Sequence, residues 1–201
     1  FMKIYIYLSV ILLGLYSIPA AGQGSMIQLN FAPALPVGKT ADFTKNFTGR
    51  GANFEFYKMN ENQTGYGVEF GTMNFFEKVP DQLFESGSAS LHGTQYRYLK
   101  ITPIMGSFIY VFNATKPFKP FVAFGAGAAI NTQTVSMGIF VDKVSPRQFI
   151  IRPELGAIYQ ISDYVGIKLS SKYYQTFENS EMRAQSILGF NLGFVMLNFG
   201  K

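Results

Sequence analysis

The sequence predicts an all-β fold: an eight-stranded antiparallel up-and-down transmembrane β-barrel, preceded by a cleavable signal peptide. Three observations lead to this fold class: a short apolar run at the N-terminus, segments with a two-residue hydrophobic period, and a composition rich in aromatic and poor in charged residues. The period is clearest over residues 148–177, where two alternating segments meet across the short turn at Ser162 and Asp163. A half-buried soluble sheet shares this alternation with a membrane barrel, so the other two observations decide between them.

The N-terminal residues predict export of the chain. Lys3 precedes an almost unbroken apolar run over residues 4–18, and the mostly small residues of 19–23 suit cleavage by signal peptidase. The run is shorter than the about 20 apolar residues that a membrane-spanning helix needs. We therefore predict a signal peptide over residues 1–22 and one barrel domain over residues 23–201, with no transmembrane helix after the signal.

The composition favours a wall that faces lipid. Aromatic residues make up 16% of the chain, with 21 Phe and 12 Tyr, whereas charged residues make up only 14%. A soluble sandwich keeps its outer face wet and needs more charge than this. The net charge of +5 is mild and dispersed, which argues against nucleic acid as a partner, and the absence of cysteine excludes disulfides.

Eight segments have the expected alternation and a length that suits tilted membrane-spanning strands. They are residues 26–33, 51–59, 64–75, 95–110, 121–132, 149–160, 165–172 and 184–199. Short turns are expected at Asn60, Asn113 and Ser162, and long connections elsewhere, including one over residues 77–94. An even number of strands puts both termini on one side, which is the periplasmic side in outer-membrane barrels. Pro103 and Pro153 lie inside strands, and we expect a bulge or local irregularity at each.

Three stretches, PELGAIYQISDYVGIKLSSKYY, YLKITPIMGSFIYVF and PFKPFVAFGAGAAI, resemble the outer-membrane β-barrel domain family of OmpA-like and OmpX-like small barrels. The resemblance covers nearly the whole mature chain and implies architecture rather than activity. It implies a location in the bacterial outer membrane, contact with outer-membrane lipid, and recognition of the last strand by the barrel assembly machinery during insertion. Envelope or surface proteins are expected partners for the extracellular loops.

The side chains expected to face the lumen include a set of charges. With acids and bases in near balance, this set should form a mutually paired network, since unpaired charges in so narrow a lumen would be costly to bury. Its members are Glu55, Glu69, Lys100, Arg152, Glu154, Lys168 and Lys172. The glycine and alanine inner face of residues 121–132 leaves room for such bulky side chains. We expect a plugged lumen rather than a pore, with a proton or ion path as the alternative reading.

The sequence assigns no catalytic, cofactor-binding or metal-binding residue. His92 follows a serine-rich stretch with a nearby carboxylate, as in small barrels that resemble lipid A deacylases or acyltransferases, but a flexible loop offers a triad no rigid scaffold. We interpret it as a solvated loop histidine. Tyrosines near strand ends, Tyr173 and Tyr174 among them, are expected in interfacial girdles.

The predicted function is that of a non-enzymatic integral outer-membrane barrel with a plugged polar lumen, which is structural, adhesive or an accessory to an envelope complex. One alternative is a soluble exported barrel of lipocalin type that binds an apolar ligand. That fold would place Val122, Phe124, Ile167 and Leu169 inside. A lipid A-modifying barrel enzyme is the other alternative.

Overall fold

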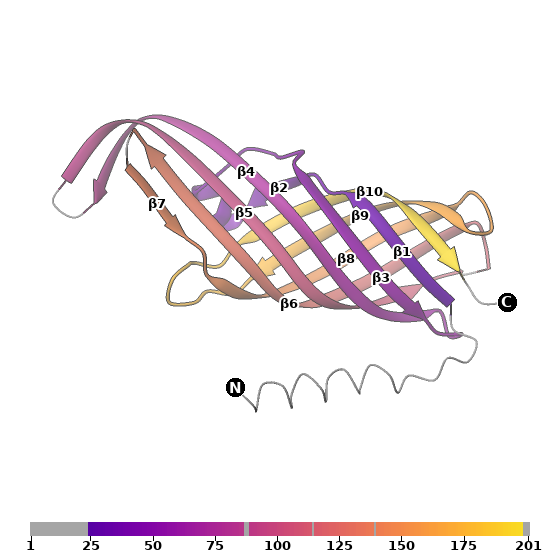
Figure 1. The fold of residues 1–201 in the computed structure, drawn as a ribbon. Helices are drawn as coiled ribbons and strands as arrows, with labels where there is room; N and C mark the ends of the chain where they lie inside the picture. Colours follow the sequence, from indigo (N-terminus) through magenta and orange to yellow (C-terminus); the bar gives the residue numbers. More distant parts are fainter. Residues whose placement is uncertain (1–23, 87–88, 114, 139, 199–201) are drawn as a thin grey trace, which may run out of the picture.

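The computed structural model describes residues 24–198 except 87–88, 114 and 139, and describes only the backbone of residues 81–92 (Figure 1). The predicted signal peptide, residues 1–22, lies outside the described residues. Within the described part, no helix has the length and apolar character needed to cross a membrane.

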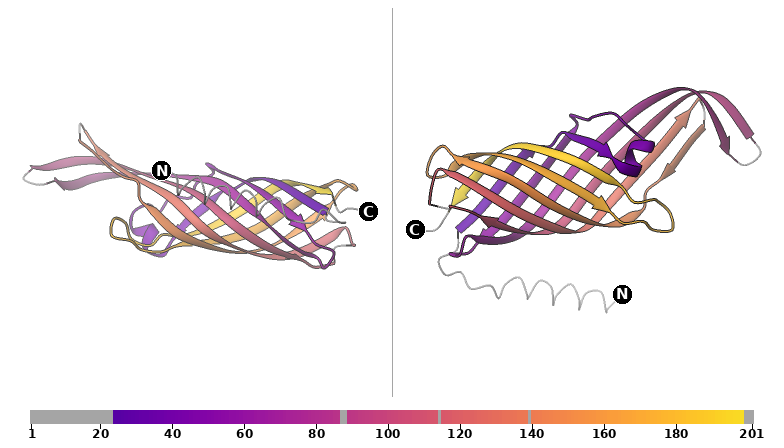
Figure 2. Two further views of the ribbon diagram at one scale, coloured as in Figure 1. Left: turned by 60° about the horizontal axis from the view of Figure 1, so that its bottom comes forward. Right: turned by 180° about the vertical axis from the view of Figure 1, so that it is seen from behind.

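Ten strands and one short 3-10 helix make up the described chain. They are β1 (Gly24–Phe31), β2 (Ala34–Val37), η1 (Gly38–Asp42), β3 (Gly51–Met59), β4 (Thr64–Ser86), β5 (Ala89–Val111), β6 (Phe118–Met137), β7 (Phe140–Val144), β8 (Arg147–Gln160), β9 (Val165–Thr176) and β10 (Ser186–Asn198). Eight of them pair antiparallel in the order β1-β3-β4-β5-β6-β8-β9-β10, and β10 pairs with β1 to close the ring (Figures 1 and 2). The predicted eight-stranded barrel is therefore confirmed.

The two strands outside the ring extend its neighbours. β2 continues β1 along β10 in the same register, after an interruption at Pro33, whose carbonyl accepts a hydrogen bond from the Phe190 N–H at 2.8 Å. β7 pairs only with β6, through a tight turn. The strand count exceeds the expected eight because these two short segments lie in stretches that we expected to be loops.

The expected long loop over residues 77–94 is wrong. β4 and β5 stay paired through this stretch, with one register shift between Val79 and Gln82, and form a hairpin that projects beyond the barrel together with β6 and β7 (Figures 1 and 2). We call these four projecting strand ends the arm. Outside the membrane a strand needs no apolar face toward lipid, so the arm has little of the alternation by which strands are recognised.

The two prolines that were expected to disturb strands each interrupt pairing on one side only. Pro103 lies opposite Ala129 of β6 in an unbroken ladder, but the ladder to β4 has a gap there without a change of register. Pro153 likewise lies opposite Phe124 of β6, with a gap in its ladder to β9. Because proline lacks the N–H that a ladder needs, the expected irregularity takes the form of a gap rather than a bulge.

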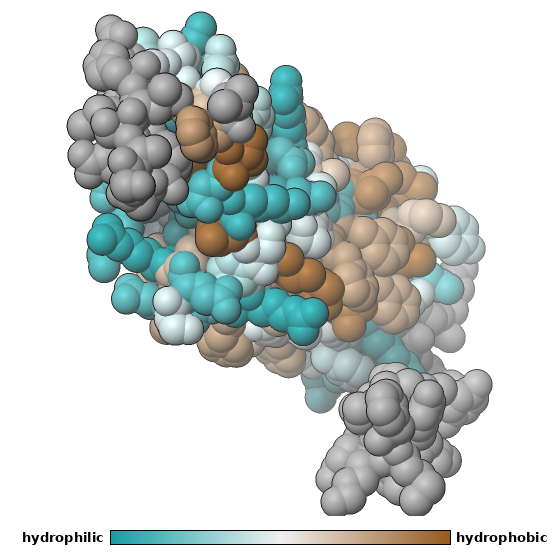
Figure 3. Space-filling view, turned by 60° about the vertical axis from the view of Figure 1, so that its left-hand side comes forward, coloured by the Kyte–Doolittle hydropathy of each residue, from teal (hydrophilic) through white to brown (hydrophobic). Residues whose placement is uncertain are grey.

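The apolar parity of the ring strands faces outward over most of the wall. Val122, Phe124, Ile167 and Leu169 are 42%, 49%, 38% and 65% exposed. These are the residues that a lipocalin-like barrel would have inside, so the structure contradicts that alternative. In Figure 3 hydrophilic side chains gather at the loop end, nearest the viewer, and hydrophobic side chains cover much of the wall behind it.

Two buried apolar clusters fill the two ends of the lumen. The cluster near the short turns, which we call the turn-side plug, consists of Met26, Tyr57, Met59, Ile109, Val111, Phe121, Ala123, Ile158, Val195 and Leu197. The cluster toward the long connections, the loop-side plug, consists of Ala34, Met73, Phe75, Leu99, Ile101, Met105, Ala129, Ile150, Tyr174, Met182 and Ile187. The predicted inward position of Lys100 implied that Leu99, Ile101 and Met105, on the other parity of the strand, face away from the lumen. That assignment is wrong, because the lumen is apolar at this level.

A side chain at Gly156 of β8 would collide with residues of both neighbouring strands, β6 and β9. A Cβ there would lie 2.6 Å from the Leu169 carbonyl oxygen and 2.8 Å from the Phe121 ring, whereas a Cβ at Gly106 would have no atom nearer than 3.9 Å. We predict that Gly156→Ala lowers the free energy of unfolding by roughly 1–3 kcal/mol through overpacking. Gly106→Ala should change it by less than about 0.5 kcal/mol. Urea unfolding of the two variants in lipid vesicles checks this, and equal stabilities would contradict it.

Candidate functional site

A cluster of six charged side chains occupies the middle of the lumen, between the two plugs. We call it the luminal network, and all six of its side chains are fully buried. β3 supplies Glu55, β4 supplies Glu69, β8 supplies Arg152 and Glu154, and β9 supplies Lys168 and Lys172. The two-residue period puts each of them on the inner face of its strand, and the registers of the four strands bring them to one level.

The two lysines of the network each lie within 3 Å of two carboxylates, and Lys172 also lies 3.9 Å from Glu154 Oε2. The Lys172 Nζ lies 2.8 Å from Glu55 Oε1 and 2.9 Å from Glu69 Oε1. The Lys168 Nζ lies 2.9 Å from Glu55 Oε1 and 2.7 Å from Glu154 Oε1. Each lysine thus bridges acids that belong to different strands, so the pairs tie the wall together across the lumen.

The guanidinium of Arg152 completes the charge balance. It forms ion pairs with Glu69 and Glu154, and its Nη2 donates a hydrogen bond to the Ser107 hydroxyl at 2.9 Å. Gly125, its partner across the β6–β8 ladder, makes the space: a Cβ there would lie 3.3 Å from both Nε and Nη2. Three acids and three bases make the network formally neutral, and each carboxylate contacts at least two cations.

Uncharged side chains complete the network, and the sequence analysis did not identify them. The Tyr57 hydroxyl donates to Glu55 Oε2 at 2.9 Å, and the Tyr174 hydroxyl donates to Glu69 Oε1 at 3.0 Å. Tyr174 therefore faces the lumen, and its assignment to an interfacial girdle is wrong. The adjacent Tyr173 is exposed on the outer wall. Neighbouring residues of a strand face opposite sides of the sheet, so only one of two adjacent tyrosines can lie on the outer wall, where a girdle forms.

Lys100 is the one residue of the predicted set that the structure places elsewhere. Its side chain is exposed on the outer wall, between Asn74 of β4 and Thr132 of β6. Its neighbours Leu99 and Ile101 point inward into the loop-side plug. The sequence analysis assumed a polar lumen along its whole length, and this assumption fails at the loop side.

The luminal network has no free group for acid–base or metal chemistry. Each of its carboxylates is engaged by cations, and apolar plugs lie on both sides of it. Across the described ranges, no group of three or more His, Cys, Asp or Glu side chains is arranged to hold a metal ion. His92 lies in β5 opposite Leu83, and its side chain is outside the described part of the structure.

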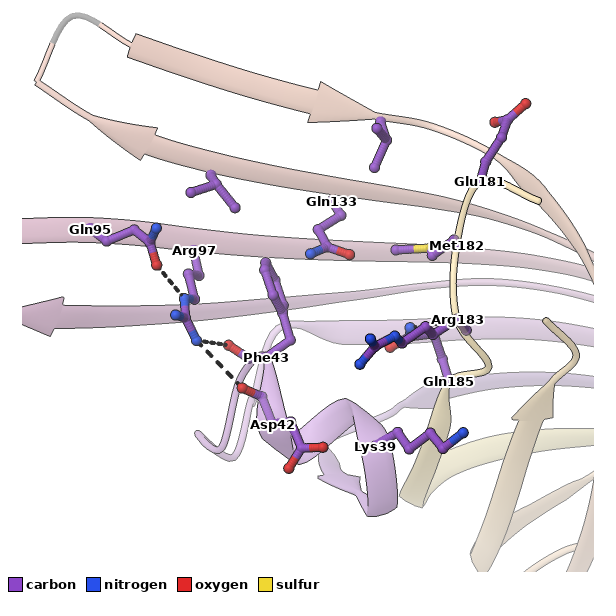
Figure 4. A pocket seen from close by; sticks show the side chains of 12 residues that line it. Lys39, Asp42, Phe43, Gln95, Arg97, Gln133, Glu181, Met182, Arg183 and Gln185 are labelled. Atoms are coloured by element: carbon purple, nitrogen blue, oxygen red, sulfur yellow. Dashed lines mark hydrogen bonds between the residues drawn. The ribbon is translucent and has the colours of Figure 1, made fainter. Parts of the chain in front are cut away.

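A second candidate site is a cleft of about 490 Å³ at the loop end, which we call the loop-end cleft (Figure 4). Its lining includes three cations, three amides, two acids and several apolar residues. The polar members are Lys39, Arg97, Arg183, Gln95, Gln133, Gln185, Asp42 and Glu181. They come from η1, from β5 and β6, and from the segment before β10, so no single stretch of sequence reveals the cleft.

Two residues define the geometry of the loop-end cleft. Arg97 donates from Nε to Gln95 Oε1 at 2.6 Å and from Nη1 to the Phe43 carbonyl at 3.2 Å, which fixes the guanidinium at the cleft wall (Figure 4). Gln185 is buried, and its Oε1 has no hydrogen-bond partner among the described residues. A buried amide oxygen without a partner is costly, so this atom favours a polar ligand or water in the cleft.

Comparison with known proteins identifies the class. No protein-family model matches the chain, and no curated protein sequence does either. Among solved structures it is similar to Ail, the attachment invasion locus protein of Yersinia pestis, in complex with the heparin analogue sucrose octasulfate, with a TM-score of 0.52 at 14% identity over 87% of this chain and 98% of that one. Neisserial surface protein A matches with a TM-score of 0.52 at 14% identity over 90% and 99% of the two chains. Pseudomonas aeruginosa OprG matches with a TM-score of 0.51 at 14% identity over 88% and 96%.

These similarities show the fold. Together with the outward apolar parity, they define the chain as a small outer-membrane β-barrel protein, as the resemblance to OmpA-like and OmpX-like barrels implied. OprG is described as an outer membrane protein, and the outward apolar parity of the wall agrees with the predicted location in a bacterial outer membrane. The three matches are described as an attachment invasion locus protein, a surface protein and an outer membrane protein.

Lys172 and Lys100 form a matched pair for testing the luminal network. We predict that Lys172→Met lowers the free energy of unfolding by about 3–5 kcal/mol, because it leaves buried carboxylates without a counter-charge. Lys100→Met, on the outer wall, should change it by less than about 1 kcal/mol. Urea titrations of the proteins in lipid vesicles measure both.

A double variant shows whether charge balance is the cause. Lys172→Met with Glu69→Gln restores neutrality and should recover part of the lost stability. A double variant less stable than Lys172→Met alone would indicate that packing, rather than charge pairing, is what Lys172 contributes.

Proposed function

We propose that the protein is a non-conducting, non-enzymatic outer-membrane barrel that acts as a surface-binding protein through its loop end. The observation that carries this proposal is the filling of the lumen. The turn-side plug, the luminal network and the loop-side plug succeed one another along the barrel axis, and the largest fully buried side chains include Arg152, Lys168 and Lys172. A pore needs a continuous aqueous path, and a proton path needs groups that exchange protons with water at both ends.

The arrangement of the titratable groups in the lumen supports a non-enzymatic role for the protein. The carboxylates of the lumen are saturated with ion pairs, and a catalytic acid or base needs a free lone pair or proton within reach of a substrate. The plugs also deny a substrate access to these groups. The lipid A-modifying alternative, which relies on the His92 stretch, has no support from the described side chains.

The loop end offers the surface for binding. The arm of β4–β7 projects from the wall, and the loop-end cleft lies beside it, with its lining drawn from η1, β5, β6, the end of β7 and the segment before β10 (Figures 1 and 4). Amide and cationic side chains with an aromatic edge suit a hydroxyl-rich or acidic ligand such as a saccharide. Surface or envelope partners are proposed to bind there, while lipid surrounds the wall and the assembly machinery acts on β10 during insertion.

The first test of the proposal is conductance. Protein refolded into planar lipid bilayers should show no stable single-channel steps, and vesicles that contain it should not swell in sucrose, because both plugs exclude water from the lumen. Folding of the protein is first shown by a gel band that shifts on boiling. A stable, reproducible conductance step from this folded protein would contradict the closed lumen.

The second test addresses the loop-end cleft. Sucrose octasulfate, the ligand held by the Ail structure, is a suitable probe for a cleft with three cations. We predict that Arg183→Gln weakens its binding about threefold to tenfold in calorimetric titrations, as the loss of one exposed charge contact implies. Lys116→Gln, at a short turn on the opposite end, is the charge-matched control and should leave binding unchanged. Equal loss in both variants would indicate non-specific attraction.

A further inference from the structure

A row of polar side chains crosses the outer wall at the loop side of the barrel. Its members lie at one level around the wall: Asn74 of β4, Lys100 of β5 and Thr132 of β6, with Arg50 just before β3 and Ser145 just after β7. The Asn74 N–H donates to the Arg50 carbonyl at 3.0 Å, Asn74 lies opposite Lys100, and Lys100 lies opposite Thr132. The Ser145 hydroxyl donates to the Thr132 hydroxyl at 3.2 Å. We call these residues the outer polar row.

The outer polar row carries two positive charges and no negative one. Arg50 and Lys100 are both exposed, and neither forms a salt bridge with a described residue. Glu55, Glu69 and Glu154 face the lumen, and Glu77, farther along β4, accepts a hydrogen bond from the Lys45 N–H at 2.7 Å. The row therefore offers an anion two positive charges and neighbouring hydrogen-bond donors.

The position of the row relative to the apolar wall indicates what kind of anion reaches it. Toward the short turns, Thr72 and Thr102 come next on the outer face of β4 and β5, and the apolar wall follows, with Phe70, Ile104 and Ile130 exposed. Toward the arm, the rings of Phe76 and Tyr98 pack with centroids 5.0 Å apart. A polar row between a lipid-facing belt and outward aromatic rings lies at the level of lipid headgroups. Since the long connections of outer-membrane barrels face outward, this is the outer leaflet.

A surface cleft adjoins the row and provides a concave site. Its volume is about 380 Å³, and its lining combines Arg50 and Asn74 with the rings of Phe47 and Phe76. Phe47 is 59% exposed. A cation beside exposed rings at the edge of the lipid belt suits an amphiphile, with its anionic group on the row and its apolar part against the wall.

We propose that the outer polar row and this cleft form a docking site for a phosphorylated lipid of the outer leaflet, with the phosphoryl group held between Arg50 and Lys100. The guanidinium fork and the ammonium supply charge-assisted donors to phosphate oxygens, and the Asn74 amide and the Thr132 hydroxyl supply neutral ones. A protein partner does not fit this level, because lipid surrounds the wall there. The proposal rests on the placement of the barrel in the membrane and is independent of the loop-end cleft.

The experiment compares retention of two lipids by three forms of the purified full-length chain in detergent, by native mass spectrometry. The lipids are bisphosphorylated lipid A and the same lipid after enzymatic dephosphorylation. The forms are the unaltered chain, Arg50→Gln with Lys100→Gln, and Lys58→Gln with Lys116→Gln. The last pair removes the same charge at the turn end of the barrel, and each form is first shown to be folded by its heat-shifted band.

The unaltered chain and the turn-end variant should retain the bisphosphorylated lipid about tenfold more than the Arg50/Lys100 variant. All three should retain the dephosphorylated lipid alike. Equal retention of the bisphosphorylated lipid by all three forms would overturn the proposal. Displacement by equimolar inorganic phosphate would also overturn it, since the site would then bind a free anion rather than a lipid.

Discussion

The pairing of buried charges is the constraint on which the rest of this barrel depends. Six ionised side chains from β3, β4, β8 and β9 meet in a lumen with no room for bulk water, and each would be costly to bury alone. A one-residue slip of any of these strands would turn its charge toward lipid and leave its partners unpaired. The network therefore fixes the register of four strands together, although a buried ion pair by itself contributes little net stability.

The surroundings of the network follow from this constraint. Gly125 of β6 lies opposite Arg152, and the Arg152 guanidinium fills the space that a side chain at Gly125 would need. The two plugs keep water away from the ion pairs, and a lower local dielectric strengthens them. In the proposed function the same plugs close the barrel to ions. Stability and the proposed absence of a pore are thus two consequences of one packing arrangement.

The sequence predicts much of this arrangement, because alternation specifies which residues share a face. It gave the ring, the three short turns and the inward set from Glu55 to Lys172 with one exception. Alternation does not specify which face is inside, and polarity settled that choice only where the lumen is polar. At the loop-side plug the lumen is apolar, so the faces around Lys100 were exchanged. The arm and the loop-end cleft were missed for another reason: they are built outside the membrane from distant segments, where no period is imposed.

The misplaced Lys100 also marks the border of the membrane. A lysine on the lipid face of a barrel costs about 2–4 kcal/mol at the bilayer midplane and about 0–1 kcal/mol near the interface. Its neighbours across the ladders are Asn74 and Thr132 rather than apolar residues, and aromatic rings follow on the next outward positions. An outward lysine is therefore tolerable at this level, because its ammonium reaches the headgroup region. Lys100 thus belongs to a second arrangement of charges. Paired charges lie in the lumen, whereas Lys100 and Arg50 lie on the outer face, at the level proposed for anionic lipid headgroups.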